Sequence, residues 1–355
     1  MVFISLTAHI NKSMIQYKTL THVHIEITNR CQASCPMCSR NFHGGMPNPL
    51  LSNGEWSVGD FKNIFTPQLL KQLTKITFCG NFGDPLINPD FEKMLEYIKD
   101  YDLYLDIHTN GSFYNAIWWK HLSKKLTKQH KIVFAPDGLS DTHSRYRIGT
   151  DFNKIITNAK SFIHAGGTAE WSFIKFKHNA HQVTAANALA DAHGFKYFTV
   201  KNSSRFAFED SFDVYDKNSN VVDKLEPVST QSAMDISNVQ KLVDASEISC
   251  YAAAQHEVYI DAHLNLFPCC FLASVPYNFH NDSDILYDAK NTIKEQHLDL
   301  VFKLGNTNLK LFTVEQIINR ESYQTVWNDY WTTKKLYTCA RTCGNIAMTP
   351  MQQYS

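Results

Sequence analysis

Short β-rich runs alternate with amphipathic helical patterns between residue 22 and about residue 200. In the helical patterns apolar residues recur at i, i+3, i+4 and i+7, as from Phe91 to Ile98 and from Phe152 to Ile163. This alternation predicts βαβ units around a parallel sheet that the helices cover. The runs that we predict to be strands are HVHIEIT from His22, KITFCG from Lys75, LYLDIHTNG from Leu103, KIVFAPDG from Lys131, WSFIKFKHN from Trp171 and KYFTVKN from Lys196.

Three cysteines follow the first predicted strand within one irregular loop. The segment CQASCPMC places Cys31, Cys35 and Cys38 at a C-x3-C-x2-C spacing, and a loop can wrap such thiols around one metal centre. Three thiolates leave one iron of a [4Fe-4S] cluster without a protein ligand, whereas an electron-transfer cluster normally has four cysteines. An open iron can bind a substrate or cofactor. The alternative is a structural zinc knuckle with His43 as its fourth ligand.

The composition limits the class of protein. With 355 residues, of which 44% are hydrophobic, the chain can form one large domain or two ordinary ones. Thirty-four basic and 34 acidic residues cancel, so we expect no nucleic-acid partner and no membrane association. The N-terminus lacks the features of a signal peptide, and we expect a cytoplasmic protein. Nine cysteines in such a chain indicate metal ligands or reactive thiols rather than disulfides.

The cysteine spacing resembles that of the radical S-adenosylmethionine (SAM) superfamily. Met37 stands where the family usually has an aromatic or other hydrophobic residue before the third cysteine. The segment FCGNFGDP is similar to the family's Gly-Gly-Glu-Pro segment, with Gly83, Asp84 and Pro85 in its last three places. In the family this backbone and acid contact the amino group of the SAM methionine. Asp84 is a departure from Glu with a shorter reach, and Gly-Asp-Pro is also an ordinary turn sequence.

Further segments of the resemblance lie at strand ends, and residues at the C-terminal ends of parallel barrel strands converge on one face. The segment HTNG supplies Thr109 and Asn110, similar to the family's ribose-contacting hydroxyl and amide groups. Asn179 ends FKHN and Arg205 follows the sixth strand, and both are candidates for contacting SAM. The resemblance covers roughly residues 20 to 205 and implies an α/β fold, a partial (β/α)6 TIM barrel. The APDG segment ends strand four in the same way. His24 and Glu26, from the first strand, are further candidates to face the cavity of the barrel.

A polar segment between residues 209 and 247 predicts a domain boundary. We therefore expect an N-terminal extension over 1–20, a radical SAM core over 21–208, a linker over 209–247 and a C-terminal α+β domain over 248–355. In that domain HEVYIDAHLNLFPCC predicts a hairpin that turns around His263 to Asn265, and VEQIINRESYQTVWNDYW predicts helix.

The last third of the chain holds a second group of cysteines, which resembles the twitch domain, a shortened relative of the SPASM domain. In that family a cysteine is followed by nine to fifteen residues and then by Gly-x4-Cys. Counting from Cys250 leads to Leu264 in the glycine place and then to Cys269, whereas a count through Asn265 selects Cys270. We favour Cys269. The resemblance thus implies an auxiliary cluster held by Cys250, Cys269, Cys339 and Cys343.

Alternatives for these cysteines are a four-cysteine zinc site and buried free thiols, because spacing alone does not distinguish zinc from iron–sulfur ligation. We expect the spare thiols of Cys79 and Cys270 to be simple core residues rather than hydrogen-atom donors. A donor would make the protein an epimerase.

The resemblance implies a radical SAM enzyme of oxidoreductase or peptide-maturase type, with Cys31, Cys35 and Cys38 as catalytic cluster ligands. A flavodoxin or ferredoxin would reduce the first [4Fe-4S] cluster, and SAM at its open iron would be cleaved to a 5′-deoxyadenosyl radical. That radical would abstract a hydrogen atom from a peptide or protein substrate, and the auxiliary cluster, expected to be [4Fe-4S], would accept an electron or orient the substrate. Oxidation or epimerisation of a small polar metabolite or sugar is the alternative. A metal-stabilised binding protein without catalysis is the more distant one.

Overall fold

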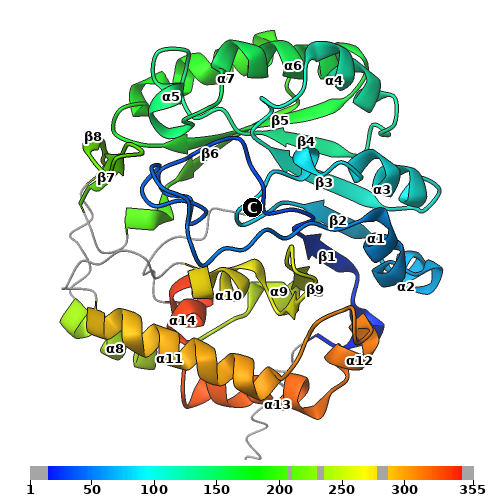
Figure 1. Ribbon diagram of the computed structural model, residues 1–355, viewed down its shortest axis with the longest axis vertical. Helices are drawn as coiled ribbons and strands as arrows, with labels where there is room; N and C mark the ends of the chain where they lie inside the picture. Colours follow the sequence, from blue (N-terminus) through cyan, green and yellow to red (C-terminus); the bar gives the residue numbers. More distant parts are fainter. Residues whose placement is uncertain (1–14, 207–209, 230–235, 278–286, 346–355) are drawn as a thin grey trace, which may run out of the picture.

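An eight-stranded sheet forms the centre of the protein in a computed structural model, which describes residues 15–206, 210–229, 236–277 and 287–345 (Figure 1). The strand order is β10-β9-β1-β2-β3-β4-β5-β6, and β1 to β6 pair in parallel in chain order. This confirms the six predicted strands and the partial barrel. The strands are β1 (His22–Ile25), β2 (Lys75–Phe78), β3 (Tyr104–Thr109), β4 (Lys131–Phe134), β5 (Thr168–Lys175), β6 (Tyr197–Asn202), β7 (Phe212–Tyr215), β8 (Val221–Leu225), β9 (Glu257–Ile260) and β10 (Leu266–Phe267).

The C-terminal part of the chain adds two strands to this sheet. β9 runs parallel to β1, with Glu257 opposite His22 and Ile260 opposite Ile25. β10 pairs antiparallel with β9, which confirms the predicted hairpin. Every residue of β9 is buried, so its pairing covers the backbone groups that β1 would otherwise expose at the edge of the barrel. The domain division at residue 248 stays a prediction, and the main sheet crosses it.

Helices cover the outside of the sheet (Figure 1). Two of the predicted helices are confirmed as α3 and α6, and the helical prediction near the C-terminus corresponds to α12 and α13. The segment expected as a linker contains the β7–β8 hairpin and α8. The helices are α1 (Val58–Ile64), α2 (Pro67–Gln72), α3 (Phe91–Ile98), α4 (Ala116–Ser123), α5 (His143–Tyr146), α6 (Phe152–His164), α7 (Val183–Ala192), α8 (Ile236–Ala245), α9 (Tyr251–Ala254), α10 (Cys270–Ser274), α11 (Tyr287–Leu304), α12 (Val314–Ile318), α13 (Glu321–Thr332) and α14 (Tyr337–Cys343).

Local signals fix where several helices begin. At α1 the Ser57 hydroxyl accepts from the Asp60 backbone N–H, and the Asp60 carboxylate accepts from the Ser57 N–H, which is a complete capping box. α2 begins with Pro67 directly after Thr66, whose hydroxyl accepts from Leu69 N–H. These short helices connect β1 to β2 and pack their apolar faces on the sheet.

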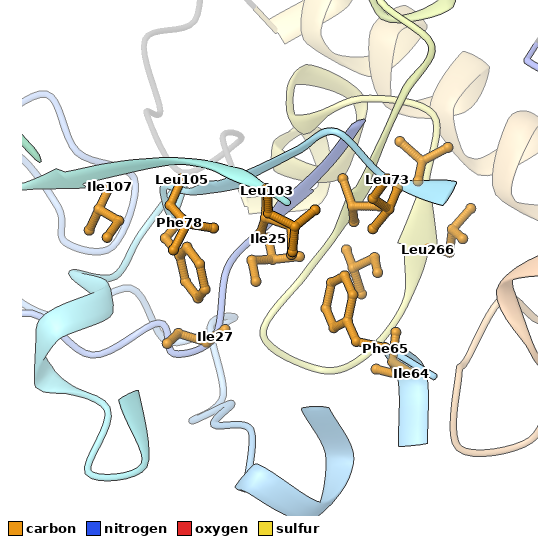
Figure 2. Close-up of a cluster of buried hydrophobic side chains, with 14 of the residues drawn as sticks. Ile25, Ile27, Ile64, Phe65, Leu73, Phe78, Leu103, Leu105, Ile107 and Leu266 are labelled. Atoms are coloured by element: carbon orange, nitrogen blue, oxygen red, sulfur yellow. The ribbon is translucent and has the colours of Figure 1, made fainter. Parts of the chain in front are cut away.

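Alternate residues of the strands face opposite sides, and the two sides differ in chemistry. One side is the hydrophobic core, where Ile25, Phe78 and Ile107 of neighbouring strands pack with Ile64 and Phe65 at the end of α1 (Figure 2). The other side is the interior of the partial barrel, where branched apolar residues are the usual filling. Here most of the side chains are polar, with Val133 and Ile174 among the exceptions. The polar ones include His22, His24, Lys75, Thr77, Asp106, His108, Lys131, Glu170, Lys201, Glu257 and Tyr259.

Candidate active site

The loop that follows β1 brings the first three cysteines together. Cys35 is buried, and Cys31 and Cys38 are partly exposed. Two backbone hydrogen bonds shape the loop, from Ser34 N–H to Ile148 O at 2.8 Å and from Cys38 N–H to Cys35 O at 2.9 Å. The thiols lie near enough to influence one another: burial, Asp84 and Cys35 together raise the pKa of Cys31 to about 12.

The surroundings of these thiols suit an anionic metal cluster. Arg147 Nη1 lies 3.8 Å from the Cys35 sulfur, and Arg40 is close enough to Cys31 to favour its thiolate. Arg40 Nε is buried and has no hydrogen-bond partner among the described residues. Across those residues no three His, Cys, Asp or Glu side chains are spaced to hold a single metal ion. Each thiolate of a [4Fe-4S] cluster binds a different iron, so its ligands need not converge on one point.

Asp84, in the loop that follows β2, connects the end of β3 to the cysteine loop. Its side chain is almost fully buried, and its carboxylate accepts from Thr109 Oγ1 at 2.8 Å and from Asn110 N–H at 2.8 Å. The Asn110 side-chain amide donates to the same carboxylate at 2.7 Å and lies 3.6 Å from the Cys31 sulfur. Leu86 N–H completes the set at 3.1 Å. Asp84, Thr109, Asn110 and Cys31 thus form one connected group.

Gly83 and Pro85, on either side of Asp84, shape the turn. A Cβ atom at Gly83 would lie 1.8 Å from the backbone oxygen of Thr28, so only glycine fits there. Pro85 is buried and begins a short 3-10 helix, Pro85–Ile87, for which Asp84 is the N-cap. The sequence thus builds a turn that approaches the β1 end closely.

Glu26, just after β1, supports this turn from the barrel side. Its carboxylate accepts from Phe82 N–H at 2.7 Å, Gly83 N–H at 2.9 Å and the Tyr259 hydroxyl at 2.9 Å. Burial outweighs these bonds and raises the pKa of Glu26 to about 7. A small pocket adjoins the carboxylate and is lined by Asn81, Phe82, Tyr259 and other residues.

Met37 and Arg205 meet at the cysteine loop. Met37 is buried beside Cys35, its sulfur lies 3.8 Å from Ser203 Oγ, and Arg205 donates to the Met37 carbonyl. The segment after β6 therefore lies against the loop.

The candidate zinc ligand His43 is engaged elsewhere. Its ring stacks on Phe212 at 4.1 Å and on Tyr215 at 4.6 Å between ring centroids, and its Nδ1 lies 2.6 Å from the carbonyl of Asp213. The β7–β8 hairpin thus packs on the cysteine loop through His43.

The polar side chains at two strand ends form hydrogen bonds or ion pairs with other residues of the chain. Asn179 is fully buried, its Oδ1 accepts from Phe176 N–H at 2.7 Å, and its Nδ2 donates to Ile174 O at 3.0 Å, so its amide stabilises its own loop. Asp137, in the APDG segment, forms a buried ion pair of 2.6 Å with Arg147. That pair holds the guanidinium beside Cys35.

The four candidate ligands of the second cysteine group lie close together in the C-terminal part of the chain. Cys250 precedes α9, Cys269 precedes α10, and Cys339 and Cys343 stand one turn apart on α14. Cys250 shares a hydrogen bond with Cys343, which raises the pKa of Cys250, as do burial and the neighbouring thiols of Cys269 and Cys339. The buried Tyr323 hydroxyl, which has no hydrogen-bond partner among the described residues, faces Cys250 and Cys269. Four thiols and an unpaired hydroxyl suit a buried metal cluster.

Leu264 and the positions of Cys269 and Cys270 bear on which of these two cysteines is the fourth candidate ligand. Leu264 has a φ of +68° although it is not glycine, so it takes the conformation for which the family pattern has glycine. Cys269 lies with the other three thiols. Cys270 packs instead against Tyr259 and interacts with His24 in the barrel.

Several residues of this site were not identified from the sequence. Gln32 Nε2 donates to the Asn110 Oδ1 at 2.7 Å, and Arg40, Arg147 and Tyr323 face the thiols. No motif marks the arginines or the tyrosine. For Gln32, its position next to Cys31 in the sequence could have indicated that it belongs to the site.

No helix among the described residues is long and apolar enough to cross a membrane.

No protein-family model and no curated protein matches the sequence. Solved structures do match it. The anSMEcpe structure with bound AdoMet is 14% identical with a TM-score of 0.52 and covers 85% of this chain and 81% of its own. Its complex with AdoMet and the Cp18Cys peptide is 14% identical with a TM-score of 0.50 over the same shares.

SuiB from Streptococcus suis is 13% identical with a TM-score of 0.50 and covers 90% of this chain and 67% of its own. Across three SuiB structures the match spans 62 to 67% of the SuiB chain, about two thirds of its length or less. At these identities the likeness concerns the fold. The chain therefore has the partial-barrel fold that is found in anSMEcpe, a protein solved with bound AdoMet, and in SuiB.

Proposed function

We propose that this chain is a radical SAM enzyme with its catalytic centre at the cysteine loop after β1. The observation that carries the proposal is the position of Asn110, whose amide lies 3.6 Å from the Cys31 sulfur and 2.7 Å from Asp84. Three motifs that the family resemblance involves, from three successive strand ends, thus meet at one place. A zinc knuckle would not need Asp84 or Asn110 there.

Cys31, Cys35 and Cys38 would hold a [4Fe-4S] cluster, with Arg40 and Arg147 stabilising its negative charge. A cluster held there would supply one-electron reduction of bound SAM and, through it, hydrogen-atom abstraction from the substrate. This chain's own residues position the cofactor. Our candidates for SAM contact are Met37, Gly83, Pro85, Thr109, Asn110 and Arg205.

The local geometry refines two of the expected roles. The Asp84 carboxylate already accepts from Leu86, Thr109 and Asn110, so we assign it to holding Thr109 and Asn110 in place. The Asn179 amide is used within its own loop, and we assign it to supporting that loop beside Cys35 rather than to contacting SAM.

We infer that Cys250, Cys269, Cys339 and Cys343 hold an auxiliary [4Fe-4S] cluster. Their mutual proximity and the facing Tyr323 hydroxyl support a four-thiolate site. Zinc is the competing occupant by ligand type, although no three thiols among the described residues are spaced to hold a single ion. A flavodoxin or ferredoxin is the reductant we expect for the enzyme.

For the substrate we favour a peptide or protein. Support comes from anSMEcpe, which shares the fold and is seen with AdoMet and the Cp18Cys peptide. A small polar metabolite or sugar is the second candidate, and one observation favours it. The interior of the barrel is lined by ionisable side chains such as His24, Asp106 and Glu257, which suit hydroxyl-bearing ligands.

The test is anaerobic reconstitution with iron and sulfide, followed by incubation with SAM and dithionite. We expect 5′-deoxyadenosine from the wild-type chain and none from Cys35→Ala. Cys270→Ala, which alters a thiol outside both proposed ligand sets, is the matched control and retains the activity. Full iron loading without any 5′-deoxyadenosine would refute the proposal.

A further inference from the structure

Cys79 lies at the mouth of the polar barrel interior, outside both groups of candidate cluster ligands. It follows β2 directly, and its backbone N–H donates to Ile25 O at 3.1 Å. The residue as a whole is partly exposed and belongs to none of the buried hydrophobic clusters among the described residues, whereas its thiol is closely surrounded by neighbouring groups. Since Phe78 is opposite Ile107 in the parallel register, Cys79 is the next residue along and stands beside His108.

His108 is in turn held by Asp106 on the same strand. The two side chains face the barrel interior, and His108 Nε2 lies 3.4 Å from Asp106 Oδ1. Asp106 is 8% exposed, and its Oδ1 has no hydrogen bond of good geometry within the described residues. Two ammonium groups flank the carboxylate, with Lys131 Nζ 3.7 Å from Oδ1 and Lys75 Nζ 3.6 Å from Oδ2. A thiol, an imidazole and a carboxylate thus lie in sequence along two neighbouring strands.

Charges around the group favour an ionised thiol. Desolvation would raise the pKa of Cys79, but the charge of His108, a hydrogen bond with His24 and the charges of His24 and Lys201 lower it below the ordinary value. Desolvation would likewise lower the pKa of His108, yet Cys79 and Asp106 raise it. The charged and titratable groups that face this space from the surrounding elements include His22, His24, Lys75, Asp106, His108, Lys131, Glu170, Lys201, Glu257, Tyr259 and Cys270.

We propose that Cys79 is a catalytic thiolate that accepts a proton from a polar substrate in the barrel, with His108 and Asp106 as positioning residues. In this step an O–H or N–H bond of the substrate breaks and an S–H bond forms at Cys79. The negative charge passes from the sulfur to the substrate heteroatom, and no electron is transferred. The His108 imidazolium stabilises the thiolate beforehand, and Asp106 stabilises the imidazolium.

This inference rests on the proposed function for the reaction that it serves, but the state of the thiol can be measured without substrate. The reconstituted enzyme is treated anaerobically with iodoacetamide at a series of pH values. Alkylation of the Cys79 peptide is then quantified by mass spectrometry. Only the thiolate reacts, so the midpoint of the rate profile reports the pKa of Cys79.

We expect a midpoint below the ordinary cysteine value of about 8.5. His108→Gln removes the neighbouring cation and should raise the midpoint by about one unit, which reduces the alkylation rate up to about tenfold at pH values well below the midpoint. Asp106→Asn should raise it by a smaller amount. His121→Gln, which alters an exposed histidine of α4, is the matched control and leaves the profile unchanged.

Two results would overturn the inference. One is an ordinary midpoint that His108→Gln does not move. The other is a Cys79 that is labelled only after denaturation, because a thiol closed to a small electrophile does not meet a substrate. Both outcomes are independent of SAM cleavage, since a wild-type enzyme that forms no 5′-deoxyadenosine refutes the proposed function and leaves this titration intact.

Discussion

Asn110 donates two hydrogen bonds to the same oxygen of Asp84, from its backbone N–H at 2.8 Å and from its side-chain amide at 2.7 Å. These bonds connect the end of β3 to the loop that follows β2. They also fix the orientation of the Asn110 amide, which lies 3.6 Å from the Cys31 sulfur. The buried carboxylate therefore positions the cysteine loop and the strand ends together.

Asp84→Asn should destabilise the protein and reduce SAM cleavage. The substitution keeps the size of the side chain but replaces an acceptor oxygen with an NH2 group that faces donors from Thr109 and Asn110. Leaving buried donors unpaired costs about 2 to 3 kcal/mol of the free energy of unfolding. Chemical denaturation of the iron-loaded protein measures this loss. Asp102→Asn, on an exposed side chain, is the control, and equal stabilities for the two variants would contradict the prediction.

The sequence predicted the strands around this site because each strand has a clear local pattern and ends in a recognisable segment. It did not predict that β9 pairs with β1, since the periodicity of Glu257–Ile260 carries no information about a partner far away in the chain. The same limit applies at the site. Cysteine spacing identified the thiols, but Arg147 and Tyr323 reach them only through the tertiary fold.

Glu26 should make stability depend on pH. Its pKa in the folded protein is about 7 because burial favours the protonated form, whereas its value in the unfolded chain is about 4.3. The folded state therefore binds the extra proton, and this contribution to stability is full below about pH 4 and is lost as the pH rises towards 7. Glu26→Gln should remove the dependence and gain up to about 4 kcal/mol at pH 8 relative to the wild type.

Denaturant titrations of both proteins at pH 5 and pH 8 provide the measurement for Glu26. The glutamine oxygen can still accept from Phe82 and Gly83, and its amide can donate to Tyr259, so the packing is preserved. If the free energy of unfolding changed by the same amount in both proteins between pH 5 and pH 8, the pH dependence would come from groups other than Glu26.

Gly83→Ala should disrupt the turn before Asp84. The new methyl group would lie 1.8 Å from Thr28 O, and backbone atoms cannot yield as a side chain can. We expect a loss of about 3 kcal/mol in the free energy of unfolding and lower iron content, because Thr28 leads into the cysteine loop. Gly59→Ala is the control, since its nearest neighbour is Ser57 Oγ at 3.4 Å and alanine favours α1 by about 1 kcal/mol. Similar losses for both variants would exclude the close contact as the cause.

Cys269→Ala and Cys270→Ala should differ in the iron that they retain. In a chain that also carries Cys31→Ala, Cys35→Ala and Cys38→Ala, iron reports only on the auxiliary site. Cys269 lies with Cys250, Cys339 and Cys343, so its removal should abolish binding of about four irons.

Cys270 packs on Tyr259 and interacts with His24, although its thiol also lies near that of Cys269. Its removal should leave the auxiliary iron in place. Elemental analysis of both variants after anaerobic reconstitution makes the measurement, with zinc determined in the same samples. Iron lost only in Cys270→Ala would instead select the count through Asn265. Zinc in place of iron in the Cys270→Ala variant would show that the four thiolates form a structural site, because zinc provides no electron transfer.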